Sequence, residues 1–226
     1  MSAARASFRS GVVDCLPLIL GIVPFGLISG VAAIEVGLSA AHALGMSVII
    51  FAGASQLAAI ELIGQDAPAL VIVVTVLVIN VRMMMYSASI APHFQRLEER
   101  WKLLLSYVLT DQAYALSILK FEQEDVKKRW YYLGVALPLW IVWQIATMVG
   151  IVLGASIPSE WNLGFTVPLI FLALLVPTMK NRPSVAAAVV GGGVAVAAAG
   201  FPFNLGLLVG ALCGIVVGVV VAERGR

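Results

Sequence analysis

The chain contains few charged residues, few metal-binding residues and no P-loop. Only 12% of its 226 residues are charged, and it has two histidines and two cysteines. Cys15 and Cys213 lie in separate apolar segments, so neither a disulfide framework nor a zinc site is predicted. No nucleophile, base and orienting third group stand at a workable spacing. We therefore expect that the protein is not an enzyme and that it has no cofactor.

The charge that is present does not indicate nucleic-acid binding. The net charge is +2, and the lysines and arginines lie in short loops and at the termini. Hydrophobic residues make up 61% of the chain and the mean hydropathy is +1.02, whereas soluble domains are about 45 to 50% apolar. A spanning helix needs about 20 apolar residues, and its backbone must bond internally. These features predict an all-α, polytopic transmembrane helical bundle that forms one domain over residues 1–226.

Eight apolar runs are candidates for membrane spans. They cover residues 12–36, 40–64, 67–93, 103–121, 130–156, 162–179, 184–200 and 203–222. Arg5 and Arg9 precede the first run as in a signal peptide, but the run is too long for one. The fourth run contains several polar residues and could instead be an amphipathic surface helix. We expect about eight spans, some broken or kinked at the midplane.

The distribution of basic residues decides whether the fourth run crosses the membrane, because lysine and arginine accumulate in cytoplasmic loops. If this run crosses and the N-terminus is inside, ten basic residues lie inside, and Arg96, Arg100 and Lys102 lie outside. If it does not cross, only Arg5 and Arg9 remain clearly inside. The rule therefore predicts that residues 103–121 cross and that both termini are cytoplasmic.

A weak internal repeat would divide the chain into halves at 12–121 and 130–222. A Leu-Pro-Leu sequence at 16–18, which recurs at 137–139, indicates this repeat. Halves of four spans share one orientation. An inverted repeat would need an odd number of spans in each half or a re-entrant element.

Polar or helix-breaking residues lie near the midpoint of each of the first four runs, so we expect them to share one depth. The clusters are Pro24, Phe25 and Gly26; Gly53, Ala54, Ser55 and Gln56; Asn80 and Arg82; and Thr110, Asp111 and Gln112. With Tyr86, they place the predicted substrate site among the first four spans.

Two of these clusters favour an interrupted helix. Pro24 removes a backbone N–H and Gly26 tolerates unusual dihedral angles, so unwinding there would free backbone groups for a substrate carboxylate or ammonium. A simple proline kink is the alternative. The small residues at 53–55 allow close backbone approach. Gln56 offers a donor and an acceptor, either to substrate or to a neighbouring helix.

Arg82 and Asp111 are the strongest signals, because a charge in the bilayer centre is costly and marks a pathway by default. Helical spacing puts Arg82, Tyr86 and Ser89 on one stripe, and Tyr107, Asp111 and Tyr114 on another. We expect the two stripes to face each other, with the pair serving charge balance or proton coupling. The alternative is a structural ion pair without a transport role.

The last run, residues 203–222, contains glycines at four-residue spacing, which we call the glycine ladder: Gly206, Gly210, Gly214 and Gly218. Similar pairs occur at Gly26 with Gly30 and at Gly150 with Gly154. Such ladders permit close helix contact, either within the chain or with another subunit.

Three ordered motifs resemble the AzlC-type family of azaleucine-resistance proteins and branched-chain amino-acid permeases. They are F-A-G-A-S-Q at 51–56, N-V-R-M-M-M-Y-S-A-S-I-A-P at 80–92 and T-D-Q-A-Y-A at 110–115. The resemblance implies export of valine, leucine, isoleucine or methionine across the bacterial inner membrane, with a small AzlD-type membrane subunit as partner. Met83 and Gln112 depart from the family pattern, which often has histidine and an acidic residue there.

We expect secondary active export, with proton coupling through Asp111. One alternative is a permease subunit driven by a separate ATPase, which would need a larger cytoplasmic coupling surface than the short loops provide. The other is a membrane scaffold that transports nothing.

Overall fold

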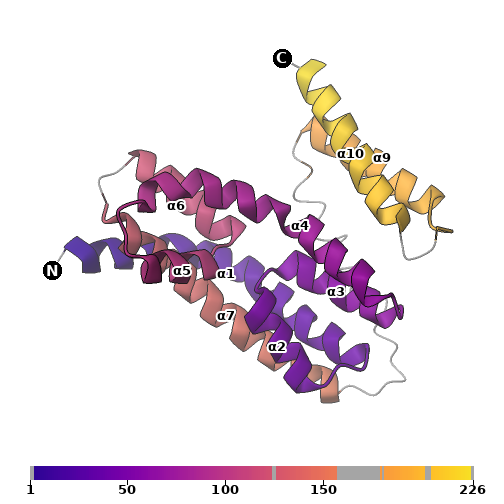
Figure 1. Ribbon diagram of the computed structural model, residues 1–226, viewed down its shortest axis with the longest axis horizontal. Coiled ribbons are helices and arrows are strands. Elements are labelled where there is room, and N and C mark those ends of the chain that lie inside the picture. The colour runs from indigo at the N-terminus through magenta and orange to yellow at the C-terminus, as the bar shows by residue number, and fades with distance from the viewer. Residues whose placement is uncertain (1–2, 124–125, 157–178, 180, 202–204, 225–226) are drawn as a thin grey trace. The chain divides into compact units, whose positions relative to one another are not determined.

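The structure, a computed structural model, describes residues 3–123, 126–156, 179, 181–201 and 205–224. Every regular element in these residues is a helix, as predicted (Figure 1). The elements are α1 (Ala3–Glu35), α2 (Ala40–Ile50), α3 (Gly53–Gly64), α4 (Ala69–Ile90), the 3-10 helix η1 (Ala91–Phe94), α5 (Glu99–Tyr107), α6 (Asp111–Gln123), α7 (Lys128–Ser156), α9 (Arg182–Ala197) and α10 (Leu205–Arg224). The chain forms two compact units, Met1–Trp161 and Asn162–Arg226. The predicted division between 121 and 130 falls inside the first unit.

Helices α1 and α7 form a close parallel pair that organises the first unit. Glycines on each helix lie against the backbone of the other: Gly11 lies against Gly134, and Gly30 against Gly150. Residue numbers rise together along the two helices, so they run in the same direction. Because these positions have no side chains, the two backbones can approach closely. Close helix contact was predicted for the pair Gly26 and Gly30 and for the pair Gly150 and Gly154.

Residues 40–64 fold back on themselves. Helix α2 ends at Ile50. The residue that caps it, Phe51, has a φ of 37°, in the left-handed region, and α3 begins two residues after Phe51. A Cβ on Gly64 would lie 2.8 Å from Cγ1 of Val36, so α3 returns to the end where α1 finishes. Each helix is about 17 Å long, roughly half of the bilayer core. The expected single span over residues 40–64 is not confirmed, because the break after Ile50 folds the segment into a hairpin of two short helices.

Helix α4 crosses the unit in the opposite direction to α1 and α7. Its first turns pack against α3. At its other end, Nδ1 of His93 lies 2.8 Å from Nζ of Lys128, and the Phe94 and Tyr132 rings meet edge to face at 5.4 Å. The end of α4 therefore lies beside the beginning of α7.

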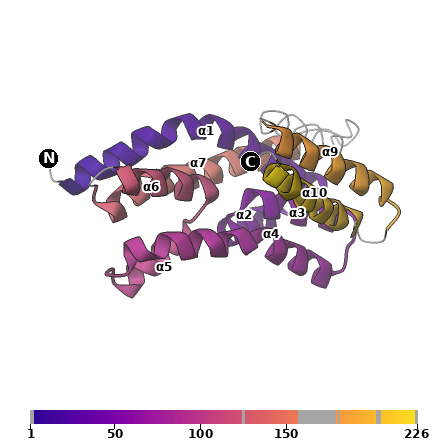
Figure 2. The same ribbon diagram turned by 90° about the horizontal axis from the view of Figure 1, so that it is seen from above.

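Residues 99–123 form a second hairpin, entering from the other end. The Trp101 ring lies 6.0 Å from Trp130, and the hydroxyl of Tyr107 lies 3.1 Å from Nε1 of Trp140, so α5 runs along α7. Helix α6 then returns, bringing Phe121 to 6.2 Å from Tyr131. The predicted crossing of residues 103–121 is therefore not confirmed either, because these residues belong to a hairpin of two short helices. Both views place α5 and α6 near the N-terminus and α2 and α3 away from it (Figures 1 and 2).

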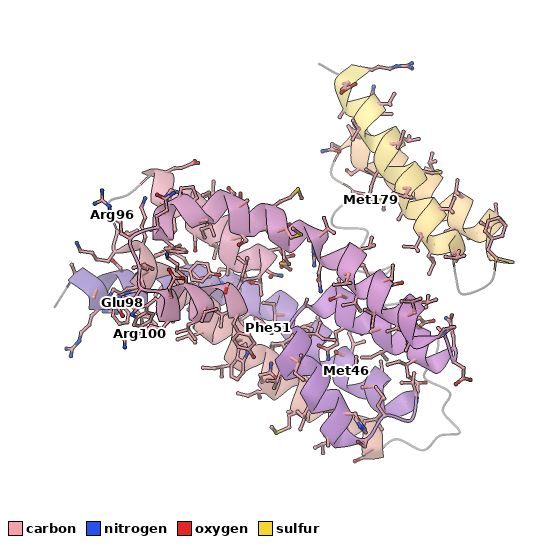
Figure 3. All side chains as sticks on the ribbon, viewed as in Figure 1. Met46, Phe51, Arg96, Glu98, Arg100 and Met179 are labelled. Carbon is pink, nitrogen blue, oxygen red and sulfur yellow. The ribbon has the colours of Figure 1, made fainter. Side chains whose placement is uncertain are left out.

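This arrangement changes where the basic residues lie. Arg96, Arg100 and Lys102 were expected on the opposite side from Arg5 and Arg9, but the structure gathers them at the same end of the unit. The guanidinium of Arg129 lies 4.5 Å from the Trp101 ring, and the amide of Lys127 donates to Ser7. Figure 3 shows Arg96, Glu98 and Arg100 together at that end.

In the second unit, α9 and α10 form an antiparallel hairpin. A Cβ on Gly210 would lie 2.8 Å from Cβ of Ala195, and one on Gly218 would lie 3.1 Å from Cβ of Ala187. Gly206 and Gly214 face α9 in the same way. The ladder therefore makes a contact within the chain.

The predicted count of eight spans is not confirmed. Four helices in the described residues are long and apolar enough to cross a membrane: α1, α4 with η1, α7 and α10. The runs at 184–200 and 203–222 correspond to α9 and α10. The run at 162–179 lies almost wholly outside the described residues.

Candidate functional site

The tips of the two hairpins touch each other partway along the first unit. The hydroxyl of Tyr107, at the end of α5, donates to the backbone oxygen of Val48 at 2.8 Å. The rings of Tyr107 and Phe51 lie 6.4 Å apart, and Figure 3 shows Phe51 well away from the charged end. Because α3 and α6 each begin just after a tip, the N-termini of these two short helices lie near this contact. Such N-termini carry partial positive charge and exposed N–H groups.

The N-terminus of α6 carries the predicted charge pair. Nη1 of Arg82 lies 3.5 Å from Oδ2 of Asp111, with 33% and 41% of the two side chains exposed. The backbone N–H of Ala113 donates to Oγ1 of Thr110, so Thr110 caps the helix. A carboxylate in the first turn is favoured by the helix dipole. The pair is formed but is not enclosed within the first unit.

The prediction that the two polar stripes face each other is confirmed beside the Arg82–Asp111 pair. Tyr86 stacks on Tyr114 with ring centroids 4.7 Å apart, and the hydroxyls of Ser89 and Tyr114 are 2.9 Å apart. Tyr107 is the exception, because the break before α6 turns it towards α2 and α7.

The N-terminus of α3 rests on Trp143 of α7. A Cβ on Gly53 would lie 2.7 Å from the indole ring, so this position has no room for a side chain. The indole N–H donates to Oγ of Ser47, which in turn donates to Oε1 of Gln144. The sequence analysis did not identify Trp143 or Ser47. The only signal in the sequence was that Gln144 is polar within an apolar run.

Buried polar atoms collect around these elements. Ser55 is satisfied by donating to the backbone oxygen of Ala52, and Ala54 beside it is half-buried. Gln56 is 0% exposed, yet neither of its amide atoms has a hydrogen-bond partner among the described residues. The same holds for Oδ1 of Asn80 and Nε of Arg82. Buried polar groups without partners are costly, so these atoms are available to bind water or substrate.

The structure does not place the cluster of Pro24, Phe25 and Gly26 in an unwound segment. Helix α1 is continuous from Ala3 to Glu35 although it contains Pro17 and Pro24, so the predicted unwinding at Pro24 is wrong. Pro24 is exposed and Phe25 half-buried. Gly26 is buried against α7, where its Cβ would lie 2.7 Å from Cβ of Ala146. Gly26 serves close helix packing.

An interaction network that the sequence analysis missed fastens the second hairpin to α1 and α7. Oδ2 of Asp14 lies 3.3 Å from Nζ of Lys120 and accepts a hydrogen bond from the hydroxyl of Tyr131 at 2.9 Å. An aspartate inside an apolar run is the signal that could have revealed it.

Comparison with known proteins places the chain in a family. The family model described as AzlC protein matches residues 17–157, more than half of the chain. An uncharacterized membrane protein of Archaeoglobus fulgidus is 34% identical over 85% of this chain and 84% of its own length. Inner membrane protein YgaZ of Escherichia coli is 28% identical, over 96% and 91%. Branched-chain amino acid transport protein AzlC of Bacillus subtilis is 24% identical, over 85% and 76%. No solved structure matches. The chain is therefore a membrane protein, and it belongs to the AzlC family.

Proposed function

We propose that this protein exports branched-chain amino acids, and methionine, by proton-coupled secondary transport across the bacterial inner membrane. The observation that carries the proposal is that two short helices, α3 and α6, begin just after the touching hairpin tips, with the Arg82–Asp111 pair at the start of α6. Interrupted helices with N-termini at the bilayer midplane are a common way for secondary transporters to bind substrate and coupling ions. The transport protein named among its relatives supports the substrate class.

The proposed substrate site lies at the hairpin tips. The first turns of α3 and α6, from Gly53 and Thr110, supply N–H groups for the substrate carboxylate. Gln56 and Asn80 supply polar contacts, because their buried side chains have unpartnered atoms. Tyr86 and the small residues Ala54 and Ser55 lie on the same elements. Pro24, Phe25 and Gly26 contribute a wall of intact helix.

Asp111 is the proposed proton carrier. Its partner Arg82 makes one ion-pair contact at 3.5 Å, and Nε of the same guanidinium has no hydrogen-bond partner within the part of the chain that the structure describes. When Asp111 takes up a proton, the guanidinium loses that contact and becomes free to pair with the carboxylate of the substrate. Protonation and substrate binding are thereby coupled through one arginine.

The orientation follows from the charged residues at the two ends of the first unit. All its basic residues except Arg82 lie at the end where α1 begins: Arg5, Arg9, Arg96, Arg100, Lys102, Lys120, Lys127, Lys128 and Arg129. The other end carries Glu35, Glu61 and Asp66 and no lysine or arginine among the described residues. The positive-inside rule makes the basic end cytoplasmic. The open end of the α2–α3 hairpin, opposite its tip, then lies on the outer side of the membrane. The open end of the α5–α6 hairpin lies on the cytoplasmic side.

A small AzlD-type membrane subunit is the proposed partner. Arg82 and Asp111 are one-third exposed or more on the first unit, and a charge pair in this position is not expected to face lipid. Leu77, Val78 and Val81 of α4 are more than half exposed, but apolar side chains can face lipid and need no partner.

The test is efflux of preloaded radiolabelled leucine, valine and methionine from cells that express the chain with and without the presumed small partner. We expect partner-dependent efflux that a protonophore abolishes. The variant Asp111→Asn should insert normally but lose protonophore-sensitive efflux. The matched control is Asp66→Asn, an exposed aspartate at the other end of the unit. Absence of efflux from a verified, inserted complex would contradict transport. Loss of assembly in Asp111→Asn, with no efflux from wild-type protein, would favour a scaffold.

A further inference from the structure

A cavity of about 330 Å³ lies between α4, η1, α5 and α7. One face of α5 lines it through Glu99, Lys102 and Ser106. It extends to Leu109 in the turn at the hairpin tip, immediately before Thr110 and Asp111. The cavity therefore joins the basic end of the unit to the tip where α6 begins.

The floor of this cavity is apolar and closed. Ile90, Phe94 and Leu105 are 5%, 7% and 3% exposed, and Tyr132 is 1% exposed. The hydroxyl of Tyr132 donates to the backbone oxygen of Leu105 at 3.0 Å, so this polar group is already satisfied. The floor thus favours a branched aliphatic side chain over a polar one.

The rim carries one charge of each sign. Nζ of Lys102 lies 2.9 Å from Oε1 of Glu99, and 38% and 84% of the two side chains are exposed. Ion pairs this exposed contribute little to stability and open easily. An α-amino acid carries an ammonium and a carboxylate on one carbon, so a single ligand can insert between these two groups and replace their mutual contact.

We propose that this cavity is a cytoplasmic vestibule that binds a zwitterionic branched-chain amino acid before it reaches the hairpin tips. Lys102 binds the carboxylate, Glu99 binds the ammonium, and the aliphatic side chain fills the apolar floor. The volume is within the range of small-molecule sites, about 300 to 1,000 Å³. The proposal rests on the transport function and on the cytoplasmic placement of the basic end.

The experiment measures leucine uptake into inside-out membrane vesicles that contain the complete transporter. In these vesicles the cytoplasmic face is outside. We expect Lys102→Gln and Glu99→Gln each to raise the KM for leucine about tenfold, with little change in the maximal rate. Glu98→Gln and Arg100→Gln are the matched controls, because this neighbouring exposed pair does not line the cavity. They should leave the KM unchanged.

Two competitors identify the role of each charge. Leucinamide lacks the carboxylate and 4-methylpentanoate lacks the ammonium, so both should inhibit wild-type uptake less than leucine does. Because the hairpin tips still bind the substrate, Lys102→Gln should reduce the preference for leucine over leucinamide more than the preference over 4-methylpentanoate, and Glu99→Gln should do the reverse. Preferences unchanged from wild type in both variants, or unchanged KM values, would overturn the vestibule while leaving the transport function intact.

Protection from alkylation provides a second measurement if either charge variant fails to insert. In Ser106→Cys, leucine on the cytoplasmic side should slow labelling by N-ethylmaleimide, relative to the same chain without that cysteine. Leucinamide at the same concentration should protect less. Equal labelling with and without leucine would overturn the proposal. Absence of uptake by wild-type vesicles would instead contradict the transport function itself.

Discussion

The two-hairpin arrangement predicts that two loops lie on the opposite sides of the membrane from those expected for eight spans. With the N-terminus inside, eight spans would put residues 65–68 inside and residues 94–98 outside. The structure returns α3 to the end where α1 finishes and gathers Arg96 at the basic end. Single cysteines at Gln65 and Arg96 therefore distinguish the two arrangements, since both positions are exposed.

The size of the expected effect follows from the charges. Nine basic residues lie at one end of the first unit and none at the other among the described residues. A basic residue near an anionic cytoplasmic surface contributes about 1 kcal/mol, so the preference for one orientation is several kcal/mol. A preference of about 2.7 kcal/mol already gives a 99:1 distribution. Labelling should therefore be close to all or none.

The assay uses a membrane-impermeant maleimide on intact cells and on inside-out vesicles, in a chain with Cys15→Ala and Cys213→Ala. Gln65→Cys should react in cells, and Arg96→Cys only in inside-out vesicles. The parent chain without cysteines controls for background, and denatured samples confirm that both thiols can react. The reverse pattern would refute the hairpins, and labelling of both sites from both sides would refute a single orientation.

Three further predictions concern stability. Gly30→Ala should lower the melting temperature of the detergent-solubilised protein, because the added methyl meets the backbone of α7 and overpacking costs about 1 to 3 kcal/mol. Tyr107→Phe loses the hydrogen bond to Val48 at the hairpin tips and should cost about 1 kcal/mol in chemical unfolding. Asp14→Asn removes the charge that pairs with Lys120, and should increase amide hydrogen exchange in α6 up to fivefold.

Each of these has an internal control. Gly21 lies on the same helix with nothing within 4 Å of its Cβ position, so Gly21→Ala should be neutral or stabilising. If Gly30→Ala is as stable as Gly21→Ala, the contact between α1 and α7 is not close-packed. Tyr114→Phe tests whether the loss in Tyr107→Phe is specific to the tips. Unchanged exchange in α6 of Asp14→Asn, with Asp66→Asn as control, would show that the network does not fasten the hairpin.

The candidate charge pair could be predicted from the sequence, because a charge inside an apolar run is costly and helical spacing fixes which neighbours share its face. Arg82, Tyr86 and Ser89 meet Asp111 and Tyr114 for this reason. The unwinding expected at Pro24 does not occur. Proline removes only one donor, and the helix continues past it from Ala3 to Glu35.

The sequence by itself determined that this is an all-helical membrane protein of one family, because hydropathy and ordered motifs are local properties. It could not determine which apolar runs cross. A run of 25 apolar residues is equally compatible with one span and with two half-length helices folded back on each other. The difference lies in the left-handed turn at Phe51, the packing of Gly64 against Val36, and the contact of Tyr107 with Val48. These contacts join residues far apart in the chain or depend on packing, so only the tertiary structure decides that residues 40–64 and 99–123 form hairpins whose tips meet.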